Sequence, residues 1–218
     1  MSIKPVIAIT MGDAAGIGPE IILKTFLGTE TRDRNLLVIG DLVILNEVKK
    51  ILKYDGVTLN AIDSIEDAIW EPATMNIWDM KLLSLDGFKP GMVSQAAGDA
   101  AFRYVTEGIR LANEKKVSAV VTAPINKEAI QLAGHHYAGH TEIFAAYTET
   151  ENYAMLLYDQ KFSVIHISTH IPLADAISTL NTKRVEQVIR LAESSMKKIL
   201  GRSPRIAVAG LNPHAGEN

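Results

Sequence analysis

Cysteine is absent from this chain of 218 residues, and so is any apolar run long enough to cross a bilayer. Without thiols there is no disulfide framework, no thiolate metal site and no cysteine nucleophile, so any metal ligands are histidines or carboxylates. The N-terminal sequence MSIKPVIAITMGD contains too short an apolar run for a signal peptide. We therefore expect a cytoplasmic protein that does not enter a membrane.

An excess of charge of either sign is also lacking. Lysine and arginine number 22 against 25 aspartates and glutamates, which leaves a net charge of -3 and a pI near 6.1. This balance offers no basic surface for nucleic acid or anionic lipid, so we expect neither as a partner. The 47% of hydrophobic residues suffices for a folded core in a chain of this length.

Short apolar runs alternate with amphipathic stretches, which is typical of parallel strands joined by crossover helices. We predict an α/β fold, with helices over residues 96–115 and after a cap at Asn181 or Thr182. The apolar runs are nearly continuous, as in strands covered on both faces. No repeat or linker marks a domain boundary, so we expect residues 1–218 to form one α/β region. The predicted strands are residues 6–10, 36–40, 119–123, 162–168 and 205–210.

The segment ITMGDAAGIGPEII leads from a strand into a glycine-rich turn, with Pro19 at the first position of a helix. Such a loop can present backbone N–H groups to an anion. Its spacing matches neither the dinucleotide fingerprint nor the phosphate loop with its lysine, which favours a plain strand-to-helix turn. Asp13 is open to two interpretations, a polar group lining a cleft or a carboxylate that bonds backbone amides of the turn.

In VTAPINKEAIQLAGHHYAGHTEIF a strand ends near Thr122, a helix follows, and a new helix is predicted to begin at Thr141. Open α/β sheets bind ligands at the carboxyl ends of strands and the starts of helices. His140 and Thr141 therefore lie where side-chain donors and free amides can hold a phosphate or carboxylate, although Thr141 can also be a plain N-cap. We interpret His135 and His136 as loop histidines that face solvent or lie behind the site.

Two more histidines follow predicted strands, His170 in HISTHIPLADA and His214 in LNPHAGE. We expect Pro172 to end the first of these strands and to keep His170 extended. Two imidazoles at the carboxyl ends of two strands can share a metal ion through their ring nitrogens. Taken singly, each is more often a structural residue, and two ligands do not complete a catalytic site. His166, inside the strand, is interpreted as packed or hydrogen-bonded.

Taken in order, the segments ITMGDAAGIGPEI, VTAPINKEAI, GHTE, THIPL and LNPHAGE resemble the 4-hydroxythreonine-4-phosphate dehydrogenase family. That family includes relatives acting on threonate and erythronate 4-phosphate. The resemblance extends from near the N-terminus to the last residue. It implies a three-layer α/β/α fold with a mostly parallel sheet, like that of isocitrate and isopropylmalate dehydrogenases. It also implies a homodimer whose active site is shared between subunits and takes a small phosphorylated substrate.

The resemblance further implies metal-dependent, NAD-linked oxidation with decarboxylation, as in pyridoxal phosphate (pyridoxine) biosynthesis. NAD or NADP accepts the hydride, and the divalent metal is zinc, magnesium, cobalt or manganese. By position, substrate contact carries over to His140 and Thr141, and metal coordination to His170 and His214. The residues do not choose between hydroxythreonine phosphate and the sugar-acid phosphates. Ala14 stands where the family usually has proline, a change expected to alter loop rigidity alone.

Family chains continue for about a hundred residues beyond NPHAGE, the size of a small domain. That part supplies a third metal histidine, further substrate contacts and most of the nicotinamide pocket. We therefore expect a truncated chain, the N-terminal part of a longer two-subdomain dehydrogenase, that is inactive alone unless Asp13, Glu217 or a partner subunit supplies the third ligand. The alternative is an inactive module that binds metal or a phosphoester. A phosphate acyltransferase shares a related architecture, but nothing in the sequence indicates a coenzyme A site.

Overall fold

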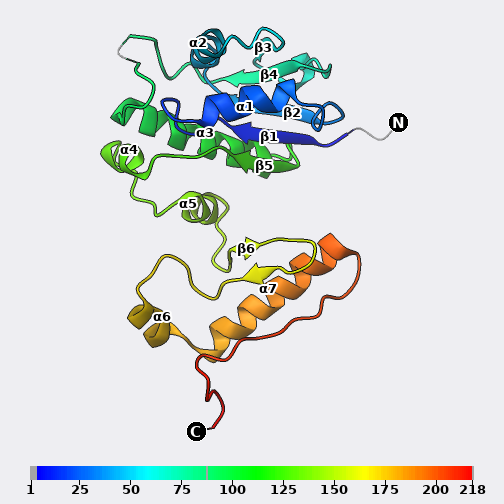
Figure 1. Cartoon of the computed structure of the whole chain (residues 1–218), viewed down its shortest axis with the longest axis vertical. Helices are drawn as coiled ribbons and strands as arrows, with labels where there is room; N and C mark the ends of the chain where they lie inside the picture. The colour runs from blue at the N-terminus through cyan, green and yellow to red at the C-terminus, as the bar shows by residue number, and fades with distance from the viewer. Residues whose placement is uncertain (1–3, 87, 218) are drawn as a thin grey trace. The chain divides into compact units, whose positions relative to one another are not determined.

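The computed structural model describes residues 4–86 and 88–217. The chain divides into two compact units, Met1–Glu149 and Thr150–Asn218, at a boundary that no linker marks. Figure 1 shows a five-stranded sheet in the first unit and the long helix α7 (Thr182–Leu200) in the second. No helix in the described residues combines the length and the apolar composition that a membrane crossing needs.

The first unit is built on a sheet with the strand order β3-β4-β2-β1-β5, in which every pair is parallel. Parallel neighbours need crossover connections, and helices supply most of them here. All five strands therefore present their carboxyl ends at one edge. The strands are β1 (Val6–Thr10), β2 (Asn35–Gly40), β3 (Thr58–Ile62), β4 (Thr74–Asp79) and β5 (Ala119–Thr122).

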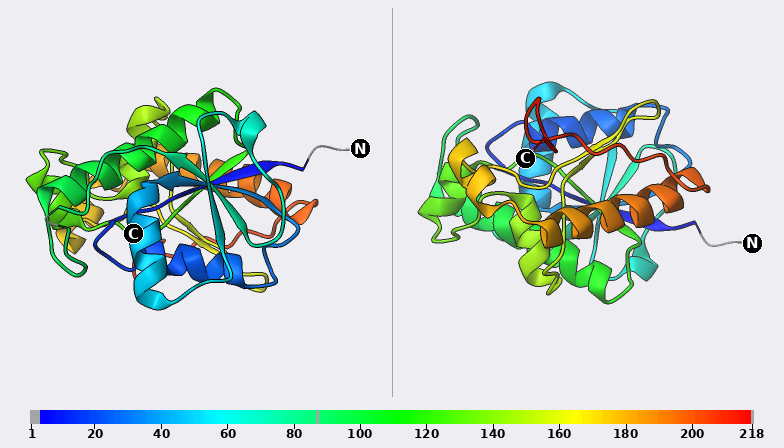
Figure 2. Two further views of the ribbon diagram at one scale, coloured as in Figure 1. Left: turned by 90° about the horizontal axis from the view of Figure 1, so that it is seen from above. Right: turned by 90° about the horizontal axis from the view of Figure 1, so that it is seen from below.

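Helices cover both faces of this sheet, with α1 and α2 on one side and α3 on the other (Figures 1 and 2). Pro19 lies in the first turn of α1. Backbone N–H groups in the first turn have no acceptor within the helix, so the lack of an N–H in proline costs no hydrogen bond there. Ser94 caps α3, because its hydroxyl accepts a 3.2 Å bond from Ala97 N–H. The helices are α1 (Gly18–Leu27), α2 (Leu42–Leu52), the short η1 (Ile65–Asp67), α3 (Gln95–Asn113), α4 (Lys127–Leu132) and α5 (His140–Tyr147).

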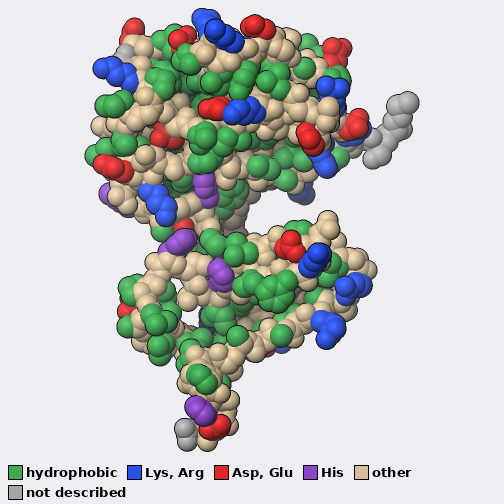
Figure 3. Space-filling model, in the orientation of Figure 1, with side chains coloured by type: hydrophobic (Ala, Val, Ile, Leu, Met, Phe, Trp, Pro, Cys, Tyr) green, Lys and Arg blue, Asp and Glu red, His purple; other side chains and the backbone are tan. Residues whose placement is uncertain are grey.

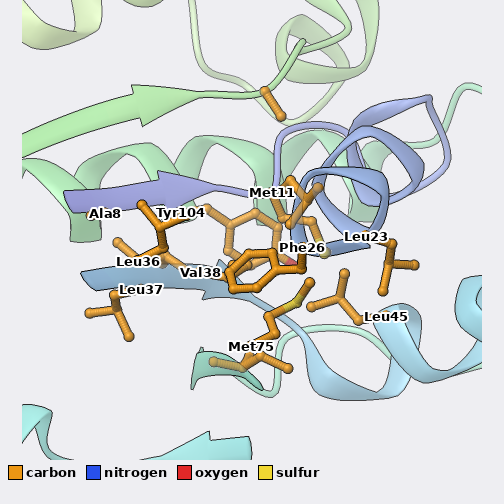
Figure 4. Close-up of a cluster of buried hydrophobic side chains, with 14 of the residues drawn as sticks. Ala8, Met11, Leu23, Phe26, Leu36, Leu37, Val38, Leu45, Met75 and Tyr104 are labelled. Carbon is orange, nitrogen blue, oxygen red and sulfur yellow. The ribbon is translucent and has the colours of Figure 1, made fainter. Parts of the chain in front are cut away.

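The core of the first unit surrounds the central strand β2, of which five of the six residues are buried. Burial of nearly every residue is expected of a parallel strand covered on both faces. Figure 4 shows Phe26 of α1, Met75 of β4 and Tyr104 of α3 among the side chains gathered there. Complete burial of a leucine, isoleucine or methionine of this kind is favourable by about 1.5–3 kcal/mol. This packing holds the strand ends, and the loops that leave them, in fixed positions.

The second unit contains two short antiparallel strands, β6 (Leu156–Leu157) and β7 (Val164–Ile165), followed by α6 (Leu173–Thr179) and α7. Asn181 caps α7 by accepting a 2.9 Å hydrogen bond from Arg184 N–H. The predicted helix after Asn181 is thereby confirmed.

Apolar side chains in the second unit are mostly exposed. Among its described residues, Val188 and Ala192 of α7 are the buried hydrophobic ones, whereas Phe162 and Leu173 are each 77% exposed. An apolar cavity of about 390 Å³ lies between β7, α6, α7 and residues 206–211. This unit therefore buries little apolar surface within itself.

The predicted α/β class with a mostly parallel sheet is confirmed. The apolar runs at residues 6–10, 36–40 and 119–123 form β1, β2 and β5, and the helix predicted over residues 96–115 is α3. The structure also contains strands β3 and β4, which the pattern of apolar runs does not predict.

Two predicted strands of the second unit are wrong. Of residues 162–168, only Val164–Ile165 form a strand, and it pairs antiparallel with β6. Residues 205–210 form no strand in the described structure, and no described strand pairs with them. An extended apolar run becomes a strand only when a neighbouring strand hydrogen-bonds to its backbone. The residues of the run itself do not specify that neighbour.

Candidate functional site

The turns that follow β1 and β5 meet at the carboxyl edge of the sheet. Asp13 N–H donates a 2.9 Å hydrogen bond to the carbonyl of Pro124. Gly12 has φ +70°, and a Cβ there would lie 2.3 Å from the same carbonyl oxygen. A Cβ on Gly18 would lie 2.2 Å from the Met11 carbonyl. Both glycines thus serve the packing of the chain's own backbone, which supports the interpretation of this segment as a strand-to-helix turn.

Asp13 is 6% exposed and bonds within this turn. Its Oδ1 accepts a 2.9 Å hydrogen bond from Ala15 N–H, which is the turn-bonding alternative left open by the sequence. Burial raises the pKa of this carboxyl above its usual value, and the bond from Ala15 opposes the rise. The carboxylate therefore stiffens the turn, and its role as a cleft-lining group stays a prediction.

A second buried carboxylate, Asp41, directly follows β2 at the same edge. It accepts hydrogen bonds from Tyr104 Oη at 2.5 Å, Leu82 N–H at 2.8 Å and Leu83 N–H at 3.1 Å. Burial raises the pKa of Asp41, and the three bonds oppose that rise. Burial also raises the pKa of the Tyr104 hydroxyl. This pair was not predicted from the sequence, where the available signal was an aspartate placed directly after a continuous apolar run.

The GHTE segment forms the start of α5, a helix of eight residues. The helix begins at His140 with Gly139 as its N-cap, so the alternative in which Thr141 is the N-cap is wrong. Gly139 has no side chain with which to cap the helix. In the described structure the N-cap therefore makes no side-chain hydrogen bond to the first-turn amides, and the carboxylate of Glu142 lies in the same turn at the positive end of the helix dipole.

His140 is half-buried in the first turn of α5. Its Nε2 is a buried atom with no hydrogen-bond partner among the described residues. Burial lowers the pKa of this imidazole, which keeps the ring neutral at pH 7. A buried polar atom without a partner costs about 1–3 kcal/mol. The unsatisfied nitrogen and the uncapped helix start therefore occur in the same short stretch of chain.

The two histidines before α5 differ in their surroundings. His136 is exposed, as expected of a loop histidine. The His135 side chain is 25% exposed, and its Nε2 lies 2.8 Å from Asp99 Oδ1. Its ring also stacks on Phe102, with ring centroids 3.7 Å apart. His135 is therefore tied to α3.

His170 lies between β7 and α6 and is exposed. Its φ is +59°, so the expectation that it is extended is wrong. Proline restricts the residue directly before it, here Ile171, and leaves His170 free to adopt the left-handed conformation, which histidine tolerates better than most residues. His166 is half-buried, and its N–H donates a 3.0 Å hydrogen bond to the Met155 carbonyl.

His214 lies in a turn of the second unit, with its side chain 77% exposed. Its Nδ1 is 3.0 Å from Glu217 Oε2, and its N–H donates a 3.1 Å hydrogen bond to Asn212 Oδ1. Within residues 4–86 and 88–217, no three metal-ligating side chains come together. The metal assignment of His170 and His214 therefore stays a prediction.

Charged side chains of both signs intermingle on the face of the first unit that Figure 3 shows. Arg110 of α3, for example, bonds Glu107 at 2.6 Å and Glu114 at 2.5 Å. Exposed pairs of this kind contribute little to stability. The surface charge thus forms local pairs and does not by itself mark a site.

The candidate residues of the first unit lie in the turn after β1 and in the first turn of α5. An open parallel sheet with helices on both faces defines an α/β protein, and proteins of this class bind ligands at the carboxyl edge where these polar groups lie. The chain belongs to the family described as pyridoxal phosphate biosynthetic protein PdxA, which matches residues 32–218. The resemblance carried by the five sequence segments is thereby confirmed.

Relatives of known name agree with this membership. Proteins named D-threonate 4-phosphate dehydrogenase from Pectobacterium atrosepticum and Salmonella typhimurium are each 46% identical, over 98% and 97% of this chain and 65% of their own length. A crystal structure of 4-hydroxythreonine-4-phosphate dehydrogenase from Klebsiella pneumoniae is similar with a TM-score of 0.90 and 45% identity, covering 99% of this chain and 65% of that one. The chain therefore has the fold of these dehydrogenase structures and spans 65% of the length of these relatives.

Proposed function

We propose that this chain carries the substrate-binding part of an NAD-linked dehydrogenase that oxidises a small hydroxy acid phosphorylated at its fourth carbon. The names of the curated relatives favour D-threonate 4-phosphate as the substrate. 4-Hydroxythreonine 4-phosphate, from the name of the Klebsiella pneumoniae structure, has the same terminal phosphate and is the second candidate. The family description names pyridoxal phosphate biosynthesis. A role in that biosynthesis is proposed only with the second substrate.

The observation that carries the proposal is the start of α5. His140 Nε2 is buried there without a partner in the described chain, and the N-cap residue, Gly139, has no side chain that could cap the helix. Unsatisfied buried groups are rare in folded proteins, and a ligand is one way to satisfy them. A negatively charged ligand with hydroxyl groups matches both the imidazole nitrogen and the helix amides.

In this proposal the first turn of α5 binds and orients the substrate. The neutral His140 ring either donates to a carboxylate or phosphate oxygen or accepts from a hydroxyl, as its tautomer dictates. The Thr141 hydroxyl bonds a second oxygen, and the helix amides stabilise the negative charge. Two fixed polar contacts hold the reacting carbon in one orientation, which raises the rate of hydride transfer through positioning.

If bound, NAD or NADP would supply the hydride acceptor, and a divalent metal (zinc, magnesium, cobalt or manganese) would supply Lewis-acid chemistry at the substrate's alcohol. This chain offers the imidazoles of His170 and His214 for such a metal. Catalytic metal sites usually have three protein ligands, and the described residues hold no cluster of three. The donors described here do not complete a metal site, and substrate binding at α5 does not depend on one. Decarboxylation, cytoplasmic location and a homodimer with a shared site belong to the same proposal.

An inactive module that binds the phosphoester without turnover is the second candidate function. The incomplete set of metal donors favours it, because the α5 contacts do not require the metal. Both candidates share the substrate-binding role of His140 and Thr141, and they differ only in whether oxidation follows.

Isothermal titration calorimetry with the purified chain tests the proposal. D-Threonate 4-phosphate and 4-hydroxythreonine 4-phosphate are titrated alongside unphosphorylated D-threonate. The phosphorylated acid should bind at least about tenfold more tightly, because phosphate adds charge-assisted hydrogen bonds. Equal affinities for phosphorylated and unphosphorylated acids, or no binding of any of them, would refute the assignment. The same assay on a chain extended to the length of the curated relatives, followed by the absorbance of reduced NAD, then separates the dehydrogenase from the inactive module.

A further inference from the structure

His135 is held to α3 by two contacts of its side chain and to α4 by one hydrogen bond of its main chain. Its Nε2 lies 2.8 Å from Asp99 Oδ1, and its ring stacks on Phe102 with an interplanar angle of 14°. Its backbone N–H donates a 3.1 Å hydrogen bond to the Ile130 carbonyl at the end of α4. The residue is thus fixed by its ring, its ring nitrogen and its main chain.

The part of α3 that receives His135 is itself rigidly placed. Asp99 and Phe102 are three residues apart and therefore lie on the same face of the helix. Gly98 next to them lies against α4, because a Cβ there would be 2.0 Å from the Ala129 carbonyl oxygen. So close a backbone approach leaves no freedom for α4 to shift along α3.

The start of α5 depends on this attachment. A helix of eight residues is too short to be stable alone, and α5 has no side-chain cap. Its buried contact with α3 is made by Ile143, which packs in a cluster with Phe102, Val105 and Ile109. That contact orients the helix from its middle, whereas the loop of residues 134–139 sets where the first turn begins.

We propose that His135 is a positioning residue, which clamps the loop before α5 to Asp99 and Phe102 and so fixes His140 and Thr141 for substrate. The inference rests on the proposed function, because it assigns His135 an effect on the same binding site. His135 touches no substrate in this account. Its contribution passes through the loop, by the hydrogen bond to Asp99 and by the stack on Phe102.

Three substitutions at His135 separate the effect of the hydrogen bond to Asp99 from that of the stack on Phe102. His135→Ala removes both contacts, His135→Phe keeps a ring on Phe102 without the hydrogen bond, and His135→Gln keeps an amide donor within reach of Asp99 without the stack. Asp99→Ala removes the hydrogen bond from the other side. His136→Ala is the matched control, because it changes the exposed neighbour in the same loop.

The measurement is made on the free chain and then with ligand. The chain contains six histidines, so the ring proton signal of His140 can be assigned in an NMR spectrum by its loss in His140→Phe. In His135→Ala and Asp99→Ala this signal should move or broaden without any ligand present. Calorimetry with D-threonate 4-phosphate should then show roughly tenfold weaker binding in His135→Ala, because displaced contacts lose most of their value. His135→Gln should recover at least half of that loss on a logarithmic scale, and His136→Ala should match the parent chain.

A residue that served stability alone would lower the melting temperature and leave the His140 signal and the affinity unchanged, and that result would overturn the inference. An effect of His136→Ala as large as that of His135→Ala would overturn it as well. Failure of the proposed function is recognised separately, by unchanged affinity in His140→Phe. The NMR arm needs no substrate, so it decides the positioning role even then.

Discussion

The hydroxyl of Tyr104 on α3 donates a 2.5 Å hydrogen bond to the carboxylate of Asp41, which is fully buried at the end of β2. Two N–H groups of the loop after β4 bond the same carboxylate. One side chain thereby joins a strand end, a helix and a loop at the edge where open α/β sheets bind ligands. Because Asp41 is buried, loss of any donor leaves part of its charge unsatisfied.

Tyr104→Phe should lower the free energy of unfolding by about 1–3 kcal/mol at pH 7. The pKa of Asp41 is raised in the folded protein. Asp41 therefore contributes its full stabilisation below its usual pKa of 3.8, and this stabilisation is lost as the pH rises through the pKa that Asp41 has in the folded protein. The Tyr104 bond opposes that loss, so its removal should cost more at pH 7 than at about pH 4. Urea unfolding at both pH values measures this, with the exposed Tyr158→Phe as control. Equal losses at the two pH values would contradict the assignment.

Gly98→Ala should separate α3 from α4, because the new Cβ would lie 2.0 Å from the Ala129 carbonyl oxygen. We expect a loss of about 1–3 kcal/mol or more in the free energy of unfolding, despite the better helix propensity of alanine. Gly108→Ala on the same helix is the control, since its Cβ would meet the Val120 side chain at 3.1 Å, where small shifts suffice. Similar stabilities of the two variants, measured by urea unfolding, would argue against the backbone contact.

Most of the first unit follows from the order of its apolar runs. Strand β2 is almost wholly buried, and its sequence NLLVIG shows this directly. Strands β3 and β4 were missed because TLNAI and TMNIWD mix asparagine with apolar residues, so neither forms a continuous run. Asn60 and Asn76 nevertheless fit, because they hydrogen-bond each other at 2.8 Å across the two strands.

The second unit shows the limit of the same reasoning. The apolar run of residues 205–210 carries the residue types of a strand, but pairing depends on a neighbour that its own residues do not specify. The opposite holds for α7, where the capping residue Asn181 is a local signal, and the structure confirms it.

The candidate site was predictable in its residues and not in its contacts. GHTE marked a helix start, and α5 begins there. The tie between His135 and Asp99 joins residues 36 apart in the chain, which no local pattern reveals. The unpartnered state of His140 Nε2 likewise follows only from the three-dimensional packing of the described chain.

His170→Ala and His214→Ala test the predicted metal ligands. Each variant should bind zinc at least about tenfold more weakly than the parent chain, because an imidazole that ligates the ion is removed. A competition titration against a chromophoric chelator measures this, with His136→Ala as control. Zinc affinity equal to that of the parent in both variants would show that neither histidine is a ligand.

The 218-residue chain should show no NAD-dependent oxidation of D-threonate 4-phosphate, because two imidazoles are one fewer than a catalytic metal site usually has. Absorbance of reduced NAD is followed with zinc, magnesium or manganese present. Turnover by this chain would mean that a further ligand, such as Glu217 beside His214, completes the site.

The central claim is that the first turn of α5 binds the phosphorylated substrate, and calorimetry of His140→Phe and Thr141→Val tests it most directly. Both variants keep the shape of the side chain and remove its polar atom. Because His140 Nε2 has no partner in the described chain, its removal should leave the melting temperature unchanged or higher. Affinity for D-threonate 4-phosphate should fall about tenfold or more in each variant, with His136→Ala unaffected. Unchanged affinity in both variants would contradict the claim and reduce GHTE to the start of a helix.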